Sequence, residues 1–151
     1  HYDEVVTIIR SRTNKPAEGL VLSRENDVII PASGETKEDI ATASCVLKGG
    51  VALGGDLNII RSTANGVFLS YFLNNVKKYE ISKLAQGISV VHLYPGQLKT
   101  LKITLPGLQE QRKIGDALSS LDALIAVEGK RITALKDHKK GLMQGLFPGN
   151  L

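Results

Sequence analysis

Apolar residues recur through the last third of the chain at alternating spacings of four and three positions. The series reads Ile114, Leu118, Leu121, Ile125, Glu128, Ile132, Leu135, Lys139, Leu142 and Leu146. Because this spacing puts its members on one face of a helix, it predicts a single helix over about residues 108–146 with one apolar seam. At 1.5 Å per residue the helix is about 58 Å long, far longer than a helix that lies flat on a small domain. The seam therefore predicts a partner helix.

Two charged residues, Glu128 and Lys139, interrupt the seam at core positions. One interpretation is local tolerance near the surface, and the other is that they fix the register against a partner. In an antiparallel pair of identical helices, two residues face each other when their numbers sum to a constant. Glu128 then faces Lys139 of the partner only if the helices cross near residue 133 or 134. The helix also contains four glycines, each costing about 1 kcal/mol relative to alanine, so it depends on burial of the seam.

Before Pro106 the pattern changes to short β-branched and apolar runs separated by turn residues. These runs predict strands over residues 2–10, 19–22, 28–30, 43–47, 51–53, 57–61, 88–93 and 98–105. Helical spacing of Phe68, Phe72, Val76 and Tyr79 predicts a helix or a pair of helices over residues 67–81. The polar stretch 33–39 is expected to be an exposed loop that enters a short turn.

These elements predict an α+β fold, a compact mixed domain followed by one long C-terminal helix. We expect the domain to cover residues 1–107, the helix to cover 108–147 and a short tail to cover 148–151. The 42% hydrophobic content argues against disorder. No run of 18 apolar residues or secretory signal appears, so a cytoplasmic protein without a membrane span is expected.

The net charge of +4 is spread over the chain, with 12 Lys and Arg against 10 Asp and Glu in residues 1–107 and 7 against 5 in residues 108–151. This excess permits binding to a polyanion without requiring it. The single cysteine, Cys45, lies in an apolar run and is interpreted as a buried packing residue rather than a nucleophile.

Motifs that would carry catalysis are not found. The glycine-rich run 49–55 has no following Lys-Ser/Thr and is interpreted as turns rather than a phosphate loop. The histidines lack metal-ligand spacing; they are His1, His92 and His138. The carboxylates of the stretch 35–39 are interpreted as a solvated charge run rather than an acid–base pair. We therefore expect no enzymatic activity, no metal and no cofactor.

Three stretches together resemble the specificity subunit of type I restriction-modification systems: residues 31–40, 83–93 and 98–114. The last is the most specific, because the family has a strand ending in Leu-Pro that leads through Leu-x-Glu-Gln-Arg/Lys-x-Ile into a long helix. The matching residues are Leu108, Glu110, Gln111, Arg112 and Ile114. Residues 139–147 also resemble the end of that helix.

The resemblance implies a target recognition domain that reads one half of a split sequence in double-stranded DNA. It also implies a helix that pairs antiparallel with a second such helix, so that the pair serves as a ruler between recognition domains. Methyltransferase and restriction subunits, which use S-adenosylmethionine and ATP, are separate chains in this family and are the expected partners.

A full specificity subunit resembles two recognition domains and two helices, whereas one of each is present here. The family's recognition domain also has more residues before the helix, so its first strands are expected to be missing. Two copies paired through the seam would give a two-fold axis and a palindromic split target. The alternative hypothesis is a truncated or decoy assembly module that docks on methyltransferase subunits through its helix without reading DNA.

For DNA contacts we predict polar groups in two exposed loops and two lysines from the helical segment between them, because lysine suits phosphate and glutamine suits an adenine edge. The predicted residues are Ser33, Thr36, Lys37, Lys77, Lys78, Lys83, Gln86, Ser89 and His92. The competing interpretation is that residues 86–89 only shape a turn and that His92 packs.

Overall fold

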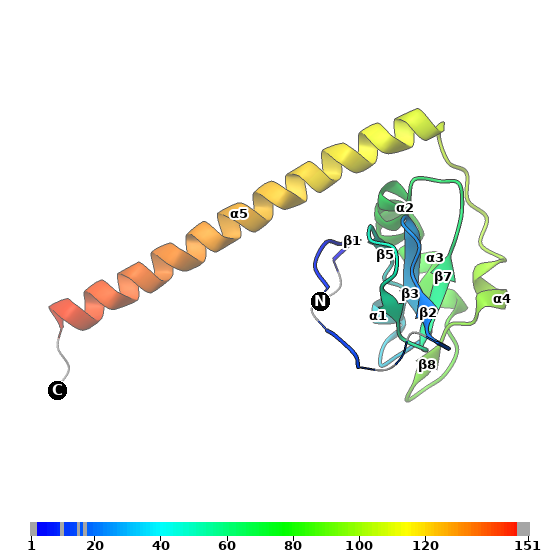
Figure 1. The fold of residues 1–151 in the computed structure, drawn as a ribbon, viewed down its shortest axis with the longest axis horizontal. Helices are drawn as coiled ribbons and strands as arrows, with labels where there is room; N and C mark the ends of the chain where they lie inside the picture. Colours follow the sequence, from blue (N-terminus) through cyan, green and yellow to red (C-terminus); the bar gives the residue numbers. More distant parts are fainter. Residues whose placement is uncertain (1–2, 10, 15, 17, 148–151) are drawn as a thin grey trace. The chain divides into compact units, whose positions relative to one another are not determined.

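The computed structural model describes residues 3–9, 11–14, 16 and 18–147 and has mixed strands and helices followed by one long helix (Figure 1). The predicted α+β class is confirmed. The chain forms two compact units, His1–Asp116 and Ala117–Leu151. We call the first unit the head. His1 and the tail 148–151 lie outside the described residues.

A four-stranded sheet is the centre of the head, in the order β1 (Val5–Val6), β5 (Ser44–Val46), β3 (Asp27–Pro31) and β7 (Leu57–Ile60). β1 pairs with β5 in parallel, whereas β3 pairs antiparallel with both of its neighbours. Val28 lies opposite Cys45 on one side and Ile60 on the other. The side chains of Val28, Ile30 and Cys45 are buried, and they supply the sheet's part of the core.

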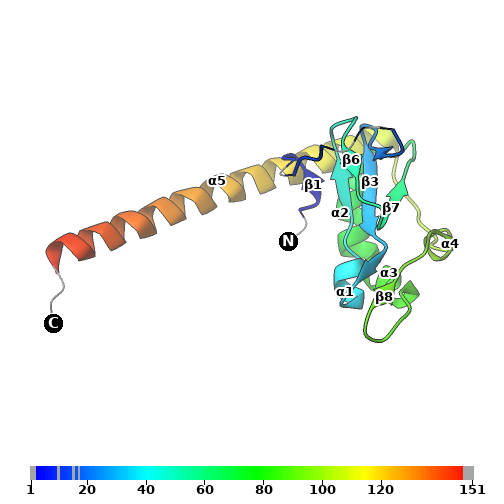
Figure 2. The same ribbon diagram turned by 60° about the horizontal axis from the view of Figure 1, so that its bottom comes forward.

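Helices α2 (Gly66–Phe72) and α3 (Lys78–Leu84) supply the rest of the core, with a π-helical turn, η1 (Leu73–Lys77), between them. α2 contacts β3 and β5, beside which it lies in Figure 2. Leu69, Leu73 and Ile81 are buried against the sheet residues. Asn65 caps α2, since its side chain accepts a hydrogen bond from the Phe68 amide at 2.8 Å.

The π-helical turn changes which residues face the core. Phe68 is buried and Phe72 packs against the core, but Val76 and Tyr79, at the same helical spacing, are exposed. A π turn holds one more residue than an α turn, so it rotates the following residues around the helix axis. Helix formation over this segment was predicted, whereas the exposure of Val76 and Tyr79 depends on this extra residue.

Two small ladders lie beside the main sheet. β2 (Val21–Leu22) pairs antiparallel with β6 (Ala52–Leu53), and β4 (Ser33–Gly34) pairs antiparallel with β8 (Val91–His92). A short helix, α1 (Lys37–Ile40), follows β4 within the stretch predicted as a loop, and the buried Ile40 anchors it. Several observed strands are shorter than the apolar runs that predicted them: β1, for example, covers Val5–Val6 of the predicted 2–10.

The predicted strand over residues 98–105 is wrong. Leu98, the first residue of the predicted strand, is the last residue of helix α4 (Pro95–Leu98), and residues 101–107 have no regular secondary structure. The amide of Leu101 donates to the Leu98 carbonyl at 3.1 Å, which is a turn bond rather than a ladder bond. Leu101 and Leu105 still pack against the core. Their alternation therefore reflects one-sided packing of an irregular segment, not pairing with a neighbouring strand.

The long helix α5 spans Leu108–Leu146, 39 residues, over the range that the seam predicted. Its first turns belong to the head, where Gln111 and Gly115 are buried. Gln111 accepts a hydrogen bond from the Asn65 amide at 2.9 Å and donates to the Pro106 carbonyl at 2.7 Å. A Cβ on Gly115 would lie 3.1–3.4 Å from atoms of the α2 N-terminus, so this position favours glycine.

No helix among the described residues is long and apolar enough to cross a membrane.

Candidate nucleic-acid interface

The two loops predicted to contact DNA lie next to each other. β4 carries Ser33 and β8 carries His92, and the register pairs these two residues directly. α1 also contacts α3 and β8. The ladder thus brings Ser33, Thr36 and Lys37 beside the segment 83–92, although the two loops are about 50 residues apart in the sequence.

The hydroxyl groups of the first loop are engaged within the chain. Ser33 donates a hydrogen bond to the carboxylate of Asp56. Thr36 caps α1: its hydroxyl accepts from the Asp39 amide at 3.0 Å and donates to the Asp39 carboxylate at 2.7 Å. Lys37, one residue later, is exposed. Of these three side chains, Lys37 therefore has the freest access to a ligand.

The second loop is a tight hairpin held by backbone bonds. The Gln86 amide donates to the His92 carbonyl at 2.9 Å, and the His92 amide donates back to the Gln86 carbonyl at 2.7 Å. Gly87 has φ +126°, and a Cβ there would lie 2.0 Å from the Val90 carbonyl oxygen, so only glycine fits. Ser89 is exposed, as are the side chains on either side of it. The loop is therefore both closely folded and open to solvent.

The ring of His92 is exposed rather than packed in the core. It stacks on Tyr94, with 6.0 Å between ring centroids and 17° between ring planes. Tyr94 is itself held in place, because the Gln97 side chain accepts from the Tyr94 amide at 2.8 Å and donates to the Leu84 carbonyl at 2.6 Å. An exposed aromatic pair of this kind offers both a flat apolar face and ring nitrogens that can form hydrogen bonds.

The predicted lysines between residues 77 and 83 differ in their environments. Lys77 forms an ion pair with Glu80 at 2.7 Å, and only 17% of its side chain is exposed. Lys78 is half-buried. The Lys83 ammonium lies 4.1 Å from the centroid of the Tyr79 ring, a cation–π contact, and its residue is exposed. Lys83 therefore combines a fixed position with access to solvent.

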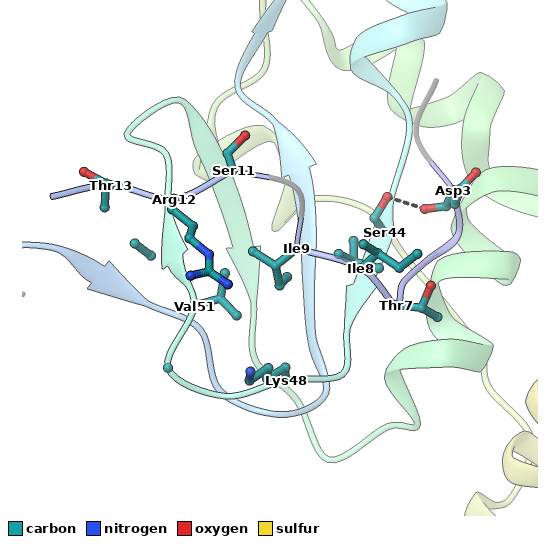
Figure 3. Close-up of a pocket in the computed structure, with 13 residues that line it drawn as sticks. Asp3, Thr7, Ile8, Ile9, Ser11, Arg12, Thr13, Ser44, Lys48 and Val51 are labelled. Carbon is teal, nitrogen blue, oxygen red and sulfur yellow. Dashed lines mark hydrogen bonds between the residues drawn. The ribbon is translucent and has the colours of Figure 1, made fainter.

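A second candidate surface, not predicted from the sequence and lined by both apolar and polar side chains, lies on another part of the head. A groove of about 1090 Å³ runs between the N-terminal segment and the turn that joins β5 to β6 (Figure 3). Arg12 and Lys48 line it from these two segments, together with Ser11, Thr13 and the apolar side chain of Val51. Because 36 positions separate the two cations, no local sequence pattern signals this groove.

The buried charges of the head are structural. Asp27, 2% exposed, accepts hydrogen bonds from the Arg61 side chain at 3.0–3.2 Å and from the Arg24 amide at 2.8 Å.

Burial, and secondarily the negative charge of Asp27, raises the pKa of the Cys45 thiol to about 11. Cys45 is therefore a neutral packing residue near neutral pH, which confirms the interpretation from the sequence. Among the described residues, no group of three or more His, Cys, Asp or Glu is placed to hold a metal ion.

The seam of α5 is exposed beyond the head. From Leu121 to Leu146 its apolar members are open to solvent, with Leu135 60% exposed, and so are Glu128 and Lys139. Ile114 and Leu118, near the head, are half-buried. Glu128 lies 3.9 Å from Arg131 of the same helix, and both side chains are mostly exposed. Within one chain, the seam positions from Leu121 to Leu146 are therefore exposed to solvent rather than packed.

The chain is similar to a known protein family and to curated members of it. The family model described as the type I restriction modification DNA specificity domain matches residues 25–137. The putative type I restriction enzyme MjaX specificity subunit of Methanocaldococcus jannaschii is 36% identical over 99 residues, 62% of this chain and 23% of that protein. The type I restriction enzyme MjaVIII specificity subunit of the same organism is 27% identical over 139 residues, 92% of this chain and 32% of that protein. The matches thus span about a quarter to a third of the length of these relatives.

Proposed function

The chain belongs to the family of type I restriction modification DNA specificity domains, and on this premise we propose that it reads one half of a split target in double-stranded DNA. In this proposal residues 1–107 are the target recognition domain and residues 108–147 are the helix that joins it to a second reader. The chain performs no catalysis itself. Methyltransferase and restriction subunits act on the DNA that it selects.

The observation that carries the proposal is the pairing of β4 with β8, which gathers the predicted contact residues on one edge of the head. Lys37, Lys83, Gln86, Ser89 and His92 are exposed there. Their chemistry covers the functions that sequence recognition needs: cations for phosphate, and amide, hydroxyl and imidazole groups for base edges. Ser33 and Thr36 support this edge through Asp56 and Asp39. Lys77 and Lys78 remain proposed phosphate contacts, although their side chains are less exposed to solvent than those of Lys37 and Lys83.

We propose that the α5 seam pairs with a second copy of the same helix, antiparallel. An exposed seam supports this, because its six exposed apolar side chains between Leu121 and Leu146, each worth about 1.5–3 kcal/mol on burial, favour association strongly. One helix of about 58 Å spans at most about 17 base pairs at about 3.4 Å each. The two-fold axis of such a pair makes the split target palindromic.

DNA binding tests the recognition half of the proposal. The chain, alone and together with its methyltransferase subunit, is incubated with a pool of randomised duplexes, and the retained DNA is sequenced. We expect a bipartite consensus, and affinity that falls steeply as salt rises. Retention of all sequences equally, with the methyltransferase present, would refute recognition. Lys83→Ala and Gln86→Ala should weaken binding if this edge contacts DNA.

The seam is tested by Leu135→Asp, which places a carboxylate in the proposed interface. We expect the chain to become monomeric in sedimentation while the thermal unfolding of the head is unchanged, because Leu135 lies outside the head. Ala123→Asp is the matched control, since residue 123 lies on the opposite face of the helix. If Leu135→Asp removes methyltransferase binding while the wild-type head leaves no footprint on DNA, the alternative of an assembly module is favoured instead.

A further inference from the structure

The tip of the hairpin between α3 and β8 presents an apolar, a hydroxyl and a second apolar side chain in succession: Ile88, Ser89 and Val90. Ile88 is 99% exposed and Val90 is 52% exposed. The loop extends away from the sheet in both ribbon views (Figures 1 and 2). Ile88 therefore contributes nothing to the core, and its apolar character needs an explanation outside folding.

The base of the tip is fixed by hydrogen bonds and buried neighbours although the tip itself is exposed. The paired backbones of Gln86 and His92 close its base, and Val91 and Leu93 are buried directly after it. Gly87 packs so closely on the Val90 carbonyl that no side chain fits. A ligand that contacts this tip pays little for ordering it, because the backbone is already in place.

We infer that this tip enters the major groove and that Ile88 contacts the 5-methyl group of a thymine; this rests on the proposed function. The major groove, about 12 Å wide, admits a two-stranded β ribbon, and apolar side chains recognise thymine there by its methyl group. The Ser89 hydroxyl between the two aliphatic residues can donate to or accept from a neighbouring base edge.

The side chains at the tip are uncharged, in contrast to several on the neighbouring helices. Lys37 and Lys83 on the flanking helices are accompanied by the exposed carboxylates Glu35 and Glu38. In the proposed function these lysines contact phosphates, whereas the uncharged side chains of the tip are left to contact bases. An uncharged, projecting and preorganised side chain beside hydrogen-bonding residues is suited to reading a base edge.

Uracil substitution tests the inference, because it removes only the methyl group. The probe is the duplex that the chain, with its methyltransferase subunit, selects from the randomised pool, with each thymine of the half-site replaced by deoxyuridine in turn. For the wild-type chain we expect about fourfold weaker binding at one thymine, the value of burying one methyl group. For Ile88→Ser we expect that thymine and uracil bind equally at the same position, and Ile88→Val should restore most of the discrimination.

Val76 is an exposed apolar residue on η1, so Val76→Ser is the control. This variant should keep the fourfold difference in affinity between the thymine and uracil duplexes. The inference is overturned if no thymine in the selected half-site is sensitive to loss of its methyl group. It is also overturned if Ile88→Ser retains the wild-type difference between thymine and uracil. If the wild-type chain selects no sequence at all, the proposed function itself fails, and this result is distinct from selective binding without a methyl contact.

Discussion

Exchange of the two charged seam residues gives the sharpest prediction about α5. If the helices pair antiparallel with facing residues that sum to 267, Glu128 of each copy meets Lys139 of the other. The apolar seam residues between Leu121 and Leu146 then face one another as well, because the alternation of four and three is symmetric about this midpoint. The apolar pairs are Leu121 with Leu146, Ile125 with Leu142, and Ile132 with Leu135.

A slip of seven residues in either direction preserves the apolar spacing but separates the charges. Glu128 then faces Ile132 or Leu146, and Lys139 faces Leu121 or Leu135. Each charge would be placed against an aliphatic side chain without a partner, which is unfavourable when that position is dehydrated. The charge pair therefore selects one register among three that the apolar pattern alone allows.

The expected magnitude follows from two copies of the pair in each dimer. A partly exposed ion pair contributes about 0.2–1 kcal/mol, and like charges in its place repel by a similar amount. Glu128→Lys should therefore weaken dimerisation by about 2 kcal/mol, about 30-fold in Kd. Loss of the contact between Glu128 and Arg131 adds at most a few tenths of a kcal/mol, because it is an exposed pair within one helix.

Sedimentation equilibrium of four proteins measures the effect: wild type, Glu128→Lys, Lys139→Glu and the double exchange. We expect both single variants to dimerise weakly and the double exchange to recover most of the wild-type Kd. The differences should shrink at high salt, which screens exposed charges. A double exchange that dimerises no better than either single variant would show that these residues do not face each other, and the proposed register would be wrong.

Two further predictions concern the head. Arg61→Ala removes the cation that pairs with the buried carboxylate of Asp27 and leaves the Arg24 amide as its donor among the described residues. We therefore expect about 2–3 kcal/mol lower stability in urea unfolding, with partial recovery in Arg61→Ala/Asp27→Asn. No loss of stability in Arg61→Ala would contradict the structural role of the pair. The thiol of Cys45, whose pKa is raised by burial from 9.0 to about 11, stays protonated in the folded chain at pH values where the unfolded chain loses its proton. The free energy of unfolding should therefore fall by up to about 3 kcal/mol as pH rises from about 9 to about 11, and Cys45→Ala should lack this part of the dependence.

The sequence predicted best what local periodicity determines. α5 covers the predicted range because its spacing of four and three extends over 33 residues and no strand has that period. The predicted strand over residues 98–105 is wrong because alternation records only which side chains face the core. A strand also needs a neighbour to bond, and no strand in the described part of the chain pairs with this segment. The exposure of Val76 and Tyr79 depends on a single π turn, which apolar spacing does not reveal.

The candidate site was predicted as residue types but not as an arrangement. Polar composition indicated the two loops, but the pairing of Ser33 with His92 is a long-range contact that no local pattern encodes. The position of Thr36 is explained by its role as the N-cap of α1, where its hydroxyl accepts from the Asp39 amide. A threonine three positions before an aspartate is typical of a helix start, so this pattern alone does not indicate a DNA contact. Ile88 was missed because apolar residues in a predicted strand are expected to be buried, and only the three-dimensional loop exposes it. Which of these residues contact DNA stays a prediction.

The stability of the helix pair alone would not favour charged residues at positions 128 and 139, whereas a single register requires them. Aliphatic residues at positions 128 and 139 would bury more apolar surface and bind the partner helix more tightly. They would also make the three registers nearly equal in energy. A slip of seven residues moves one helix along the other by about 10.5 Å, which corresponds to about three base pairs of DNA. In a helix pair that measures the spacing between two recognition domains, a mixture of registers would accept several spacers. Glu128 and Lys139 would then lower the affinity of the pair and raise the accuracy of the distance that it sets.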